Sequence, residues 1–315
     1  MACIVEDVTY RSACGRGKIY AKKWYQKNAY KETEYKGIVQ ISHGLNEHIG
    51  YYDAFARQLA EAGYIVCASD HLGHGQSAIT PLLTGYFGEQ YGYLYLVEDM
   101  YALMELMRKK YPDLPYFFFG QGIGAYPVQL LLQEHDEAVQ GIILSGCTDK
   151  LSGSFWKRPL ANMVYQIKGS TSKYKFLNRL FYRPLCGNVK KTKAPWTWLS
   201  RNESFTAEFT ADSACNFELT NVGLRDIYIL EQKTSSGAWY THFPQQTAAL
   251  LLSGSDDRLT HSGANTKRMA QRLQKSGSAH IDFKLYSGAR HTLLQDTCKD
   301  AVTTDIISWL ESQVH

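Results

Sequence analysis

The last third of the chain holds an acid and a histidine that could act as a catalytic pair. Asp257 follows an expected strand at residues 248–253, and His291 follows the next expected strand, at residues 280–286. A carboxylate that orients an imidazole ring and stabilises its protonated form is the acid–base half of a hydrolase triad. Either residue alone would suit an ordinary surface position, but their order and their places at two strand ends indicate catalysis.

A glycine-rich turn lies between an expected strand at 116–119 and an expected helix at 123–134, where a nucleophile would stand. Its outer residues match the G-x-S-x-G nucleophile elbow, in which glycines make room for a tight strand–turn–helix. The central serine is missing. The spacing matches neither a dinucleotide-binding glycine loop nor a P-loop, so a nucleotide site is not indicated. The turn consists of Gly120, Gln121, Gly122, Ile123 and Gly124.

Two further turns follow strands. The first runs from His43 to His48, and the backbone amide of Leu45 would point into a site at the carboxyl ends of the strands, where open parallel sheets bind ligands. The alternative is an ordinary turn with Asn46 as a helix cap. The second, residues 70–75, contains two histidines three residues apart, but no convincing further ligand accompanies them. We therefore expect a structural turn there, with no metal site and no cofactor.

The expected elements that position these turns alternate between short apolar strands and longer helices. Such alternation predicts a mostly parallel central sheet covered by helices on both faces. The expected strands are 18–24, 37–42, 64–69, 116–119, 141–145, 248–253 and 280–286, and the expected helices are 52–62, 96–110, 123–134, 264–275 and 300–311.

The alternation stops near residue 148 and resumes near residue 248, which predicts an insertion. Residues 150–193 hold 11 Lys or Arg and no Asp or Glu, together with several aromatic residues. We expect a core of residues 1–147 and 239–315 and a cap, or lid, of residues 148–238. The basic, aromatic segment is either a solvated face or a surface that contacts an anionic membrane or an anionic head group.

Composition sets the class of protein. With 315 residues, 44% apolar and 20% charged, the chain can bury a sizeable core and is not disordered. A formal net charge of +4 is too small over this length to indicate nucleic-acid binding. Seven scattered Cys without a CxxC pair favour a reducing compartment, so we expect a cytoplasmic protein with no secretory signal.

Taken in order, these motifs resemble the monoacylglycerol lipase and lysophospholipase branch of the α/β-hydrolases, from about residue 3 to about residue 312. The resemblance implies an α/β-hydrolase fold, a cap over an apolar acyl tunnel, no cofactor, and hydrolysis of single-chain acyl esters. It makes Asp257 and His291 the partners of the nucleophile and the Leu45 and Ile123 amides the oxyanion hole. The motifs that carry it are 43–48, 70–77, 85–88, 111–117, 120–124, 198–201, 254–259 and 288–291.

Gly122 stands where this family has its serine. Covalent hydrolysis needs an oxygen nucleophile, so we expect the chain as written to be nearly inactive. Two explanations are open: a serine ester hydrolase whose nucleophile was replaced, or a natural member that only binds an acyl-chain ligand. A peptidase or a hydrolase of small esters on the same scaffold is a weaker alternative. Acyl length, head group and oligomeric state do not follow from the sequence.

Overall fold

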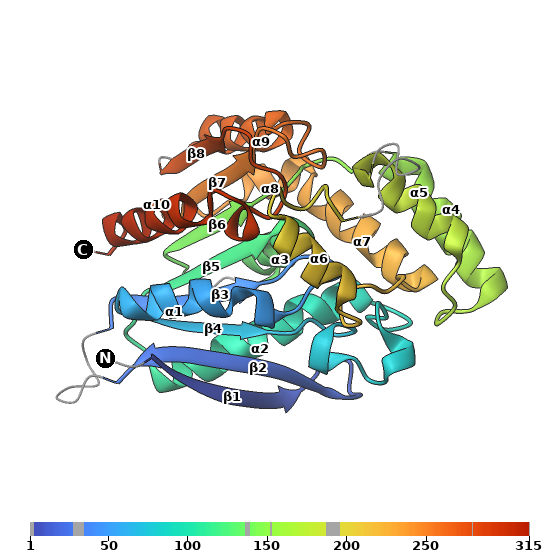
Figure 1. Cartoon of the computed structure of the whole chain (residues 1–315), viewed down its shortest axis with the longest axis horizontal. Helices are drawn as coiled ribbons and strands as arrows, with labels where there is room; N and C mark the ends of the chain where they lie inside the picture. Colours follow the sequence, from blue (N-terminus) through green and yellow to red (C-terminus); the bar gives the residue numbers. More distant parts are fainter. Residues whose placement is uncertain are drawn as a thin grey trace.

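The computed structural model describes residues 3–27, 35–135, 139–151, 153–186, 196–278 and 280–314. Within them, one eight-stranded sheet has the strand order β1-β2-β4-β3-β5-β6-β7-β8 (Figure 1). Strands β1 and β2 run antiparallel to their neighbours, and all pairs from β4 to β8 are parallel. The bounds are β1 Cys3–Arg11, β2 Lys18–Gln26, β3 Gly37–Ser42, β4 Tyr64–Ser69, β5 Tyr116–Gln121, β6 Gly141–Ser145, β7 Ala248–Gly254 and β8 Ile281–Tyr286.

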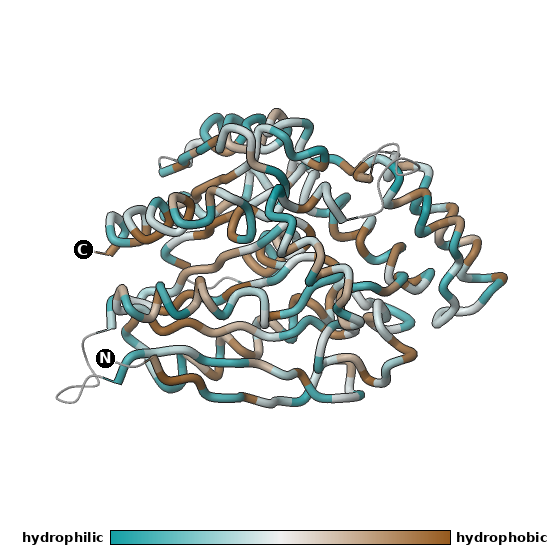
Figure 2. Tube along the Cα trace, viewed as in Figure 1, coloured by the Kyte–Doolittle hydropathy of each residue, from teal (hydrophilic) through white to brown (hydrophobic). Residues whose placement is uncertain are grey.

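The central strands are buried on both faces, as a parallel sheet covered by helices requires. Every residue of β3 to β7 is buried, and Figure 2 shows hydrophobic stretches along these strands. Alternate side chains of one strand join different cores: Ile38 belongs to the core that α2, α3 and α9 cover, whereas Val39 belongs to the core that α1 and α10 cover. These helices are α1 Asp53–Glu61, α2 Gly92–Lys110, α3 Ala125–Glu134, α9 Ala264–Lys275 and α10 Lys299–Ser312.

Among the described residues, five helices lie between β6 and β7, the position in which an insertion was expected. Helices α4 and α5 lie at the end of the molecule away from both termini, and α7 runs from that end back toward the sheet (Figure 1). The predicted division into core and cap stays a prediction; its second boundary, 238/239, falls inside α8, and residues 187–195 lie outside the described residues. The five are α4 Ser154–Lys168, α5 Lys175–Cys186, α6 Glu203–Ala211, α7 Asn221–Thr234 and α8 Gly237–Thr241.

The structure differs from the expected elements mainly at the edges. Strand β1 was not predicted: it pairs only with β2 and its residues alternate between half-buried and exposed, so its sequence has no strong apolar run. Helix α2 begins at Gly92, four residues earlier than expected, after a left-handed turn at Tyr91 with φ 61°. Helix α3 begins at Ala125 because Gly122–Gly124 form a 3-10 turn, η4.

Candidate active site

The two residues predicted to form the acid–base pair lie together. His291 Nδ1 is 3.0 Å from Asp257 Oδ2. The second carboxylate oxygen of Asp257 accepts the backbone N–H of Leu259 at 2.9 Å, which fixes the plane of the carboxylate. Asp257 is fully buried and His291 is 6% exposed, so little water competes for their contact. The indole of Trp198 lies over the His291 ring, with centroids 5.0 Å apart.

The turn after β5 keeps the backbone of a nucleophile elbow. Gly122 has φ 53°, a left-handed conformation that glycine adopts without steric cost. A Cβ built on Gly122 would lie 2.7 Å from His291 Nε2. Position 122 therefore faces the ring nitrogen on the far side from Asp257.

Two flanking glycines make this turn possible. A Cβ on Gly124 would lie 2.1 Å from the backbone oxygen of His43, and one on Gly120 would lie 2.7 Å from Ala125 Cα. Both clashes are with backbone, which cannot move aside. The close approach of β3, β5 and α3 thus requires glycine at both positions.

The neighbour of Gly122 contributes a contact that the sequence did not indicate. The side-chain amide of Gln121 donates from Nε2 to the backbone oxygen of His291 at 3.0 Å. Gln121 is 2% exposed. The elbow therefore holds the loop that carries the histidine as well as facing its ring.

The turn after β3, which contains Leu45, adjoins the elbow at the cavity beside His291. Leu45 and Ile123 line the same cavity as His291. Ile123 is the second residue of η4, and the first N–H groups of such a helix have no partner within it. Within the described residues, the N–H of Leu45 donates no hydrogen bond to backbone or side chain. Both amides are thus free to bind a ligand atom in this cavity.

A buried carboxylate shapes the turn after β3. Glu47 accepts the Gly44 N–H and the Tyr52 hydroxyl, the latter at 2.5 Å. Burial raises the pKa of Glu47 above its usual range. These contacts fix the backbone on either side of Leu45, so the direction of the Leu45 amide does not depend on a bound ligand.

Comparison with known proteins identifies the family. The family described as serine aminopeptidase, S33, matches residues 33–298. The chain belongs to this family of α/β-hydrolases. It is 26% identical to the monoglyceride lipase of Mus musculus over 282 residues, which cover 89% of this chain and 84% of that protein. It is 23% identical to the monoglyceride lipase homolog of Monkeypox virus over 299 residues, which cover 94% and 95% of the two chains.

A solved structure agrees along the whole chain. The crystal structure of a thermostable carboxyl esterase from Bacillus coagulans in complex with glycerol superposes with a TM-score of 0.91, at 25% identity, and covers 100% of both chains. The predicted α/β-hydrolase fold and the monoacylglycerol lipase-like family are thereby confirmed. The comparisons do not test the roles of the individual site residues.

The cavity beside His291 is smaller than the acyl tunnel that the resemblance implies. Its volume is about 30 Å³, room for a water molecule or two. Aromatic side chains of the inserted segment fill the rest of the space, so an acyl chain could enter only if some of them move. The cavity is lined by Gly44, Leu45, Glu47, Gln121, Ile123, Phe181, Tyr182, Leu185, Trp196, Trp198, Leu199, Leu259, His291 and Thr292.

Asn46, in this family-typical turn, connects the turn to the inserted segment. It adopts φ 58°, donates from Nδ2 to the Phe217 backbone oxygen at 2.8 Å, and accepts the hydroxyl of Tyr182. His48, and not Asn46, caps the helical turn that follows. Neither this positive φ nor these contacts to the inserted segment can be read from the sequence alone.

The histidines after β3 and β4 form structural contacts. His43 accepts the His71 N–H through Nε2 at 2.9 Å, and its Nδ1 lies 2.7 Å from the Gly44 backbone oxygen. The His71 ring contacts Ser42 Oγ at 3.1 Å. The carboxylate of Asp70 accepts the N–H groups of Ile49 and Gln76. These groups are used in holding two loops together.

Among the described residues, one group of side chains has metal-ligand atoms close together. The ligand atoms of His48, Asp212 and Cys215 lie within 4.8 Å of one another. His48 Nδ1 accepts the Gly50 N–H, so a neutral ring carries its proton on Nε2, which is 2.9 Å from Asp212 Oδ2. A metal at Nε2 would displace that proton. We therefore describe the group as a hydrogen-bonded junction between the turn after β3 and the inserted segment.

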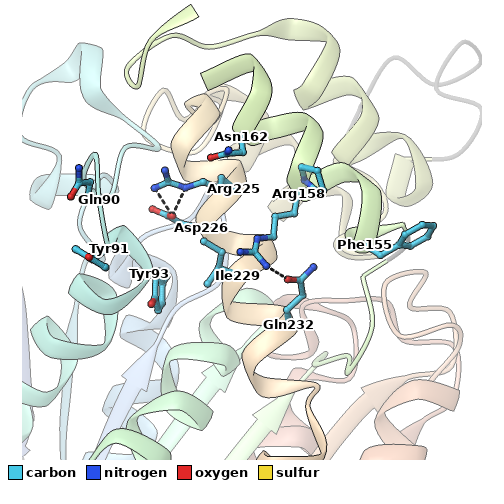
Figure 3. Close-up of a pocket in the computed structure, with 11 residues that line it drawn as sticks. Gln90, Tyr91, Tyr93, Phe155, Arg158, Asn162, Arg225, Asp226, Ile229 and Gln232 are labelled. Atoms are coloured by element: carbon cyan, nitrogen blue, oxygen red, sulfur yellow. Dashed lines mark hydrogen bonds and ion pairs between the residues drawn. The ribbon is translucent and has the colours of Figure 1, made fainter. Parts of the chain in front are cut away.

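A larger open pocket, of about 510 Å³, lies elsewhere and contains none of the candidate catalytic residues (Figure 3). Arg225 donates twice to Asp226 Oδ1, at 2.9 and 3.0 Å, while Asp226 Oδ2 has no partner among the described residues. Burial raises the pKa of Asp226 to about 7. Because no nucleophile or free amide turn faces this pocket, we do not place the active site there.

Proposed function

We propose that this chain is built as a serine ester hydrolase of the monoacylglycerol lipase or lysophospholipase type and binds single-chain acyl esters in a nucleophile-less form. One observation carries the proposal. His291 has Asp257 on one ring nitrogen and position 122 on the other, which is the arrangement that a Ser–His–Asp triad needs. Gly122 offers no atom that could attack a carbonyl carbon.

The remaining residues have defined roles in the parent mechanism. A serine at position 122 would attack the ester carbonyl while His291 accepts its proton and Asp257 stabilises the charged ring. The Leu45 and Ile123 amides would donate to the oxygen that becomes negative. His291 would then protonate the leaving alcohol, and water activated by the same ring would release the acid. Without the serine, the same residues can bind and orient an ester but cannot form the acyl-enzyme.

The second candidate is a non-catalytic binding protein for an acyl-chain ligand. It is favoured by the position of the His291 ring, whose Nε2 occupies space that a serine Cβ would need. It is also favoured by the small cavity, which leaves no preformed path for turnover. Both candidates share the ligand class and differ in whether the site retains latent catalysis.

An activity assay separates the two. Gly122→Ser should raise the hydrolysis of monoacylglycerols and short p-nitrophenyl esters by roughly 10³-fold or more over the chain as written. The matched control is Gly122→Ala, which adds the same Cβ without an oxygen and should stay at background. A folded Gly122→Ser protein that hydrolyses none of these esters would favour the binding protein.

We also propose peripheral contact with anionic membranes through α4 and α5. The support is a set of exposed apolar side chains that lie on these basic helices or, for Tyr174, directly before α5. Phe155 is 77% exposed and Ile167 is 72% exposed, which is costly in water but favourable at a lipid interface. No helix within the described residues is long and apolar enough to cross a bilayer. The set comprises Phe155, Trp156, Met163, Ile167, Tyr174 and Phe176.

For the compartment, we propose a reducing one such as the cytoplasm. All seven cysteines are free, and three of them are buried in the protein. Buried free thiols persist where glutathione keeps them reduced.

A further inference from the structure

A second cavity adjoins the one beside His291. It has a volume of about 110 Å³, and it shares three wall residues with the first cavity: Phe181, Leu185 and Leu259. The two cavities therefore lie on either side of these three side chains. A ligand whose ester lies beside His291 can reach the second cavity by a small rearrangement of this wall.

The second cavity, here called the basic pocket, has cationic side chains and no acidic lining residue among the described ones. Its cations come from three segments: the end of the β6 loop, helix α4, and the loop after β7. Arg258 stands directly between Asp257 and Leu259, so the pocket begins next to the candidate catalytic acid. The basic pocket is lined by Lys150, Leu151, Lys157, Phe181, Pro184, Leu185, Tyr228, Arg258, Leu259 and His261.

Lys157 is the residue that points to a ligand. It is only 6% exposed, and its ammonium lies 5.7 Å from the centroid of the Trp156 ring. Within the described residues it pairs with no carboxylate. Burial lowers the pKa of its ammonium, and no neighbouring acid offsets this effect. A buried cation without a counter-ion is costly, so its retention at a pocket wall indicates that an anion completes the site.

The other charges near the pocket leave it positive. Arg258 donates to the Leu185 backbone oxygen at 3.4 Å and forms no ion pair with a described carboxylate. Burial raises the pKa of Glu231, its Oε1 accepts the Leu151 N–H, and the charge of Lys150 acts on it only weakly in the opposite direction. Glu231 does not line the pocket.

We propose that the basic pocket binds the anionic head group, of phosphate type, of a single-chain acyl ester whose carbonyl lies beside His291. The inference rests on the proposed function and names its substrate class as monoacyl lipids with a phosphate-bearing head. Lys157 binds the anion from α4, and Lys150 and Arg258 surround it. A neutral monoacylglycerol would leave the Lys157 ammonium without a counter-ion.

The absence of a nucleophile allows binding to be measured at equilibrium on the full chain. We would titrate it by calorimetry with two short-chain, water-soluble lipids of the same acyl chain, a 1-acylglycerol 3-phosphate and the 1-acylglycerol. Charge-assisted contacts of this kind make the phosphate lipid bind roughly tenfold or more tightly, with the difference shrinking at high salt. Equal or weaker binding of the phosphate lipid overturns the inference and leaves the proposed function intact. If neither lipid binds, both fail.

The matched variants are neighbours on one helix. Lys157→Met keeps the apolar stem and should remove the preference for phosphate without weakening the neutral lipid. Arg158 lies in the other open pocket, where it donates to Gln232 (Figure 3), so Arg158→Gln should keep the preference. If Lys157→Met retains the preference, the assignment is wrong.

Two further measurements guard against misinterpretation. Arg258→Gln should weaken the phosphate lipid even if Lys157→Met fails to fold, and no effect of Arg258→Gln in that case overturns the inference. Inorganic phosphate and glycerol 3-phosphate are titrated alone to identify the source of the anion. If inorganic phosphate binds as tightly as the phosphate lipid, the pocket is a site for the free ion, and the head-group assignment is overturned.

Discussion

The contact between position 122 and the His291 ring predicts how the two smallest side chains will be tolerated at this position. Gly122→Ala adds a Cβ, and Gly122→Ser adds the same Cβ with a hydroxyl. Both must adopt the φ of 53° that glycine has here. Both also place Cβ at 2.7 Å from His291 Nε2, so the ring must withdraw by about 0.7 Å to reach the 3.4 Å of an ordinary contact.

The magnitudes follow from these two costs and one gain. A non-glycine residue in a left-handed conformation costs about 1–3 kcal/mol. Because Asp257 holds the ring at 3.0 Å, withdrawal adds strain to that contact. The serine hydroxyl can then donate to Nε2 and recover about 0.5–1.5 kcal/mol, which alanine cannot. We therefore expect both variants to be less stable than the chain as written, with alanine the less stable of the two.

Urea unfolding of both variants, in the parent and in a His291→Ala background, measures each term. Removing the ring should erase the difference between alanine and serine to within about 0.5 kcal/mol. It should leave only the backbone cost relative to Gly122. An alanine variant as stable as the parent would refute the strain argument. A serine–alanine difference that persists without the ring would refute the assigned hydrogen bond.

Three further predictions concern other parts of the molecule. In the Gly122→Ser background, Asp257→Asn should lower ester hydrolysis on the order of 10²-fold or more, because the His291 ring then loses the group that stabilises its positive charge. Equal rates of the two proteins at the same pH would remove Asp257 from the triad. Burial raises the pKa of Asp226 to about 7, so above about pH 4 the folded state holds a proton that the unfolded state has lost. The stability that this group contributes should therefore fall as pH rises from about 4 through 7. Asp226→Asn should gain stability relative to the parent between about pH 5 and pH 8, and a pH-independent difference in urea unfolding would contradict this. Replacing Phe155 and Ile167 together by Glu should reduce co-sedimentation with anionic vesicles and leave the binding of short-chain lipids in solution unchanged. The control Lys299→Glu, a charge change at an exposed position of α10, should leave vesicle binding unchanged.

The sequence was most informative where one local pattern decides the structure. Strands such as Gly37–Ser42 and Gly141–Ser145 consist mostly of apolar residues and are bounded by turns, and the structure places them within the predicted limits. The turn residues of the candidate site follow these strands, so their meeting at one edge of the sheet could be predicted from the parallel topology.

The contacts that the sequence did not indicate join segments far apart in the chain. Gln121 binds the loop of His291, 170 residues away, and Asn46 contacts Tyr182, 136 residues away. The local motifs of the two turns do not require a Gln or an Asn at these positions, so these contacts could not be predicted from the sequence. The position of Lys157 in a pocket without acidic side chains likewise depends on how α4 packs. The sequence showed only that Lys157 belongs to a basic segment.

The surviving acid–histidine pair does not by itself prove recent catalysis, because the same residues hold the fold together. The loop of His291 is fixed by Thr292, whose N–H and hydroxyl both donate to the Leu199 backbone oxygen at 2.8 Å. Arg290 donates to the backbone oxygens of Thr197 and Ser200. Removing either member of the buried pair would leave a polar group without its partner, at a cost of about 1–3 kcal/mol.

A chain that never hydrolyses an ester would therefore still be expected to keep Asp257 and His291 for stability. The Leu45 amide differs in this respect: no hydrogen bond to a described residue depends on it, so it is available to a ligand in the cavity. Whether the site catalyses or only binds a ligand is therefore better tested at the Leu45 amide and at the basic pocket than at Asp257 and His291. Lipid binding that requires the turn of Leu45 and Lys157, in a chain with no nucleophile, would mean that ligand recognition is the function that the site retains.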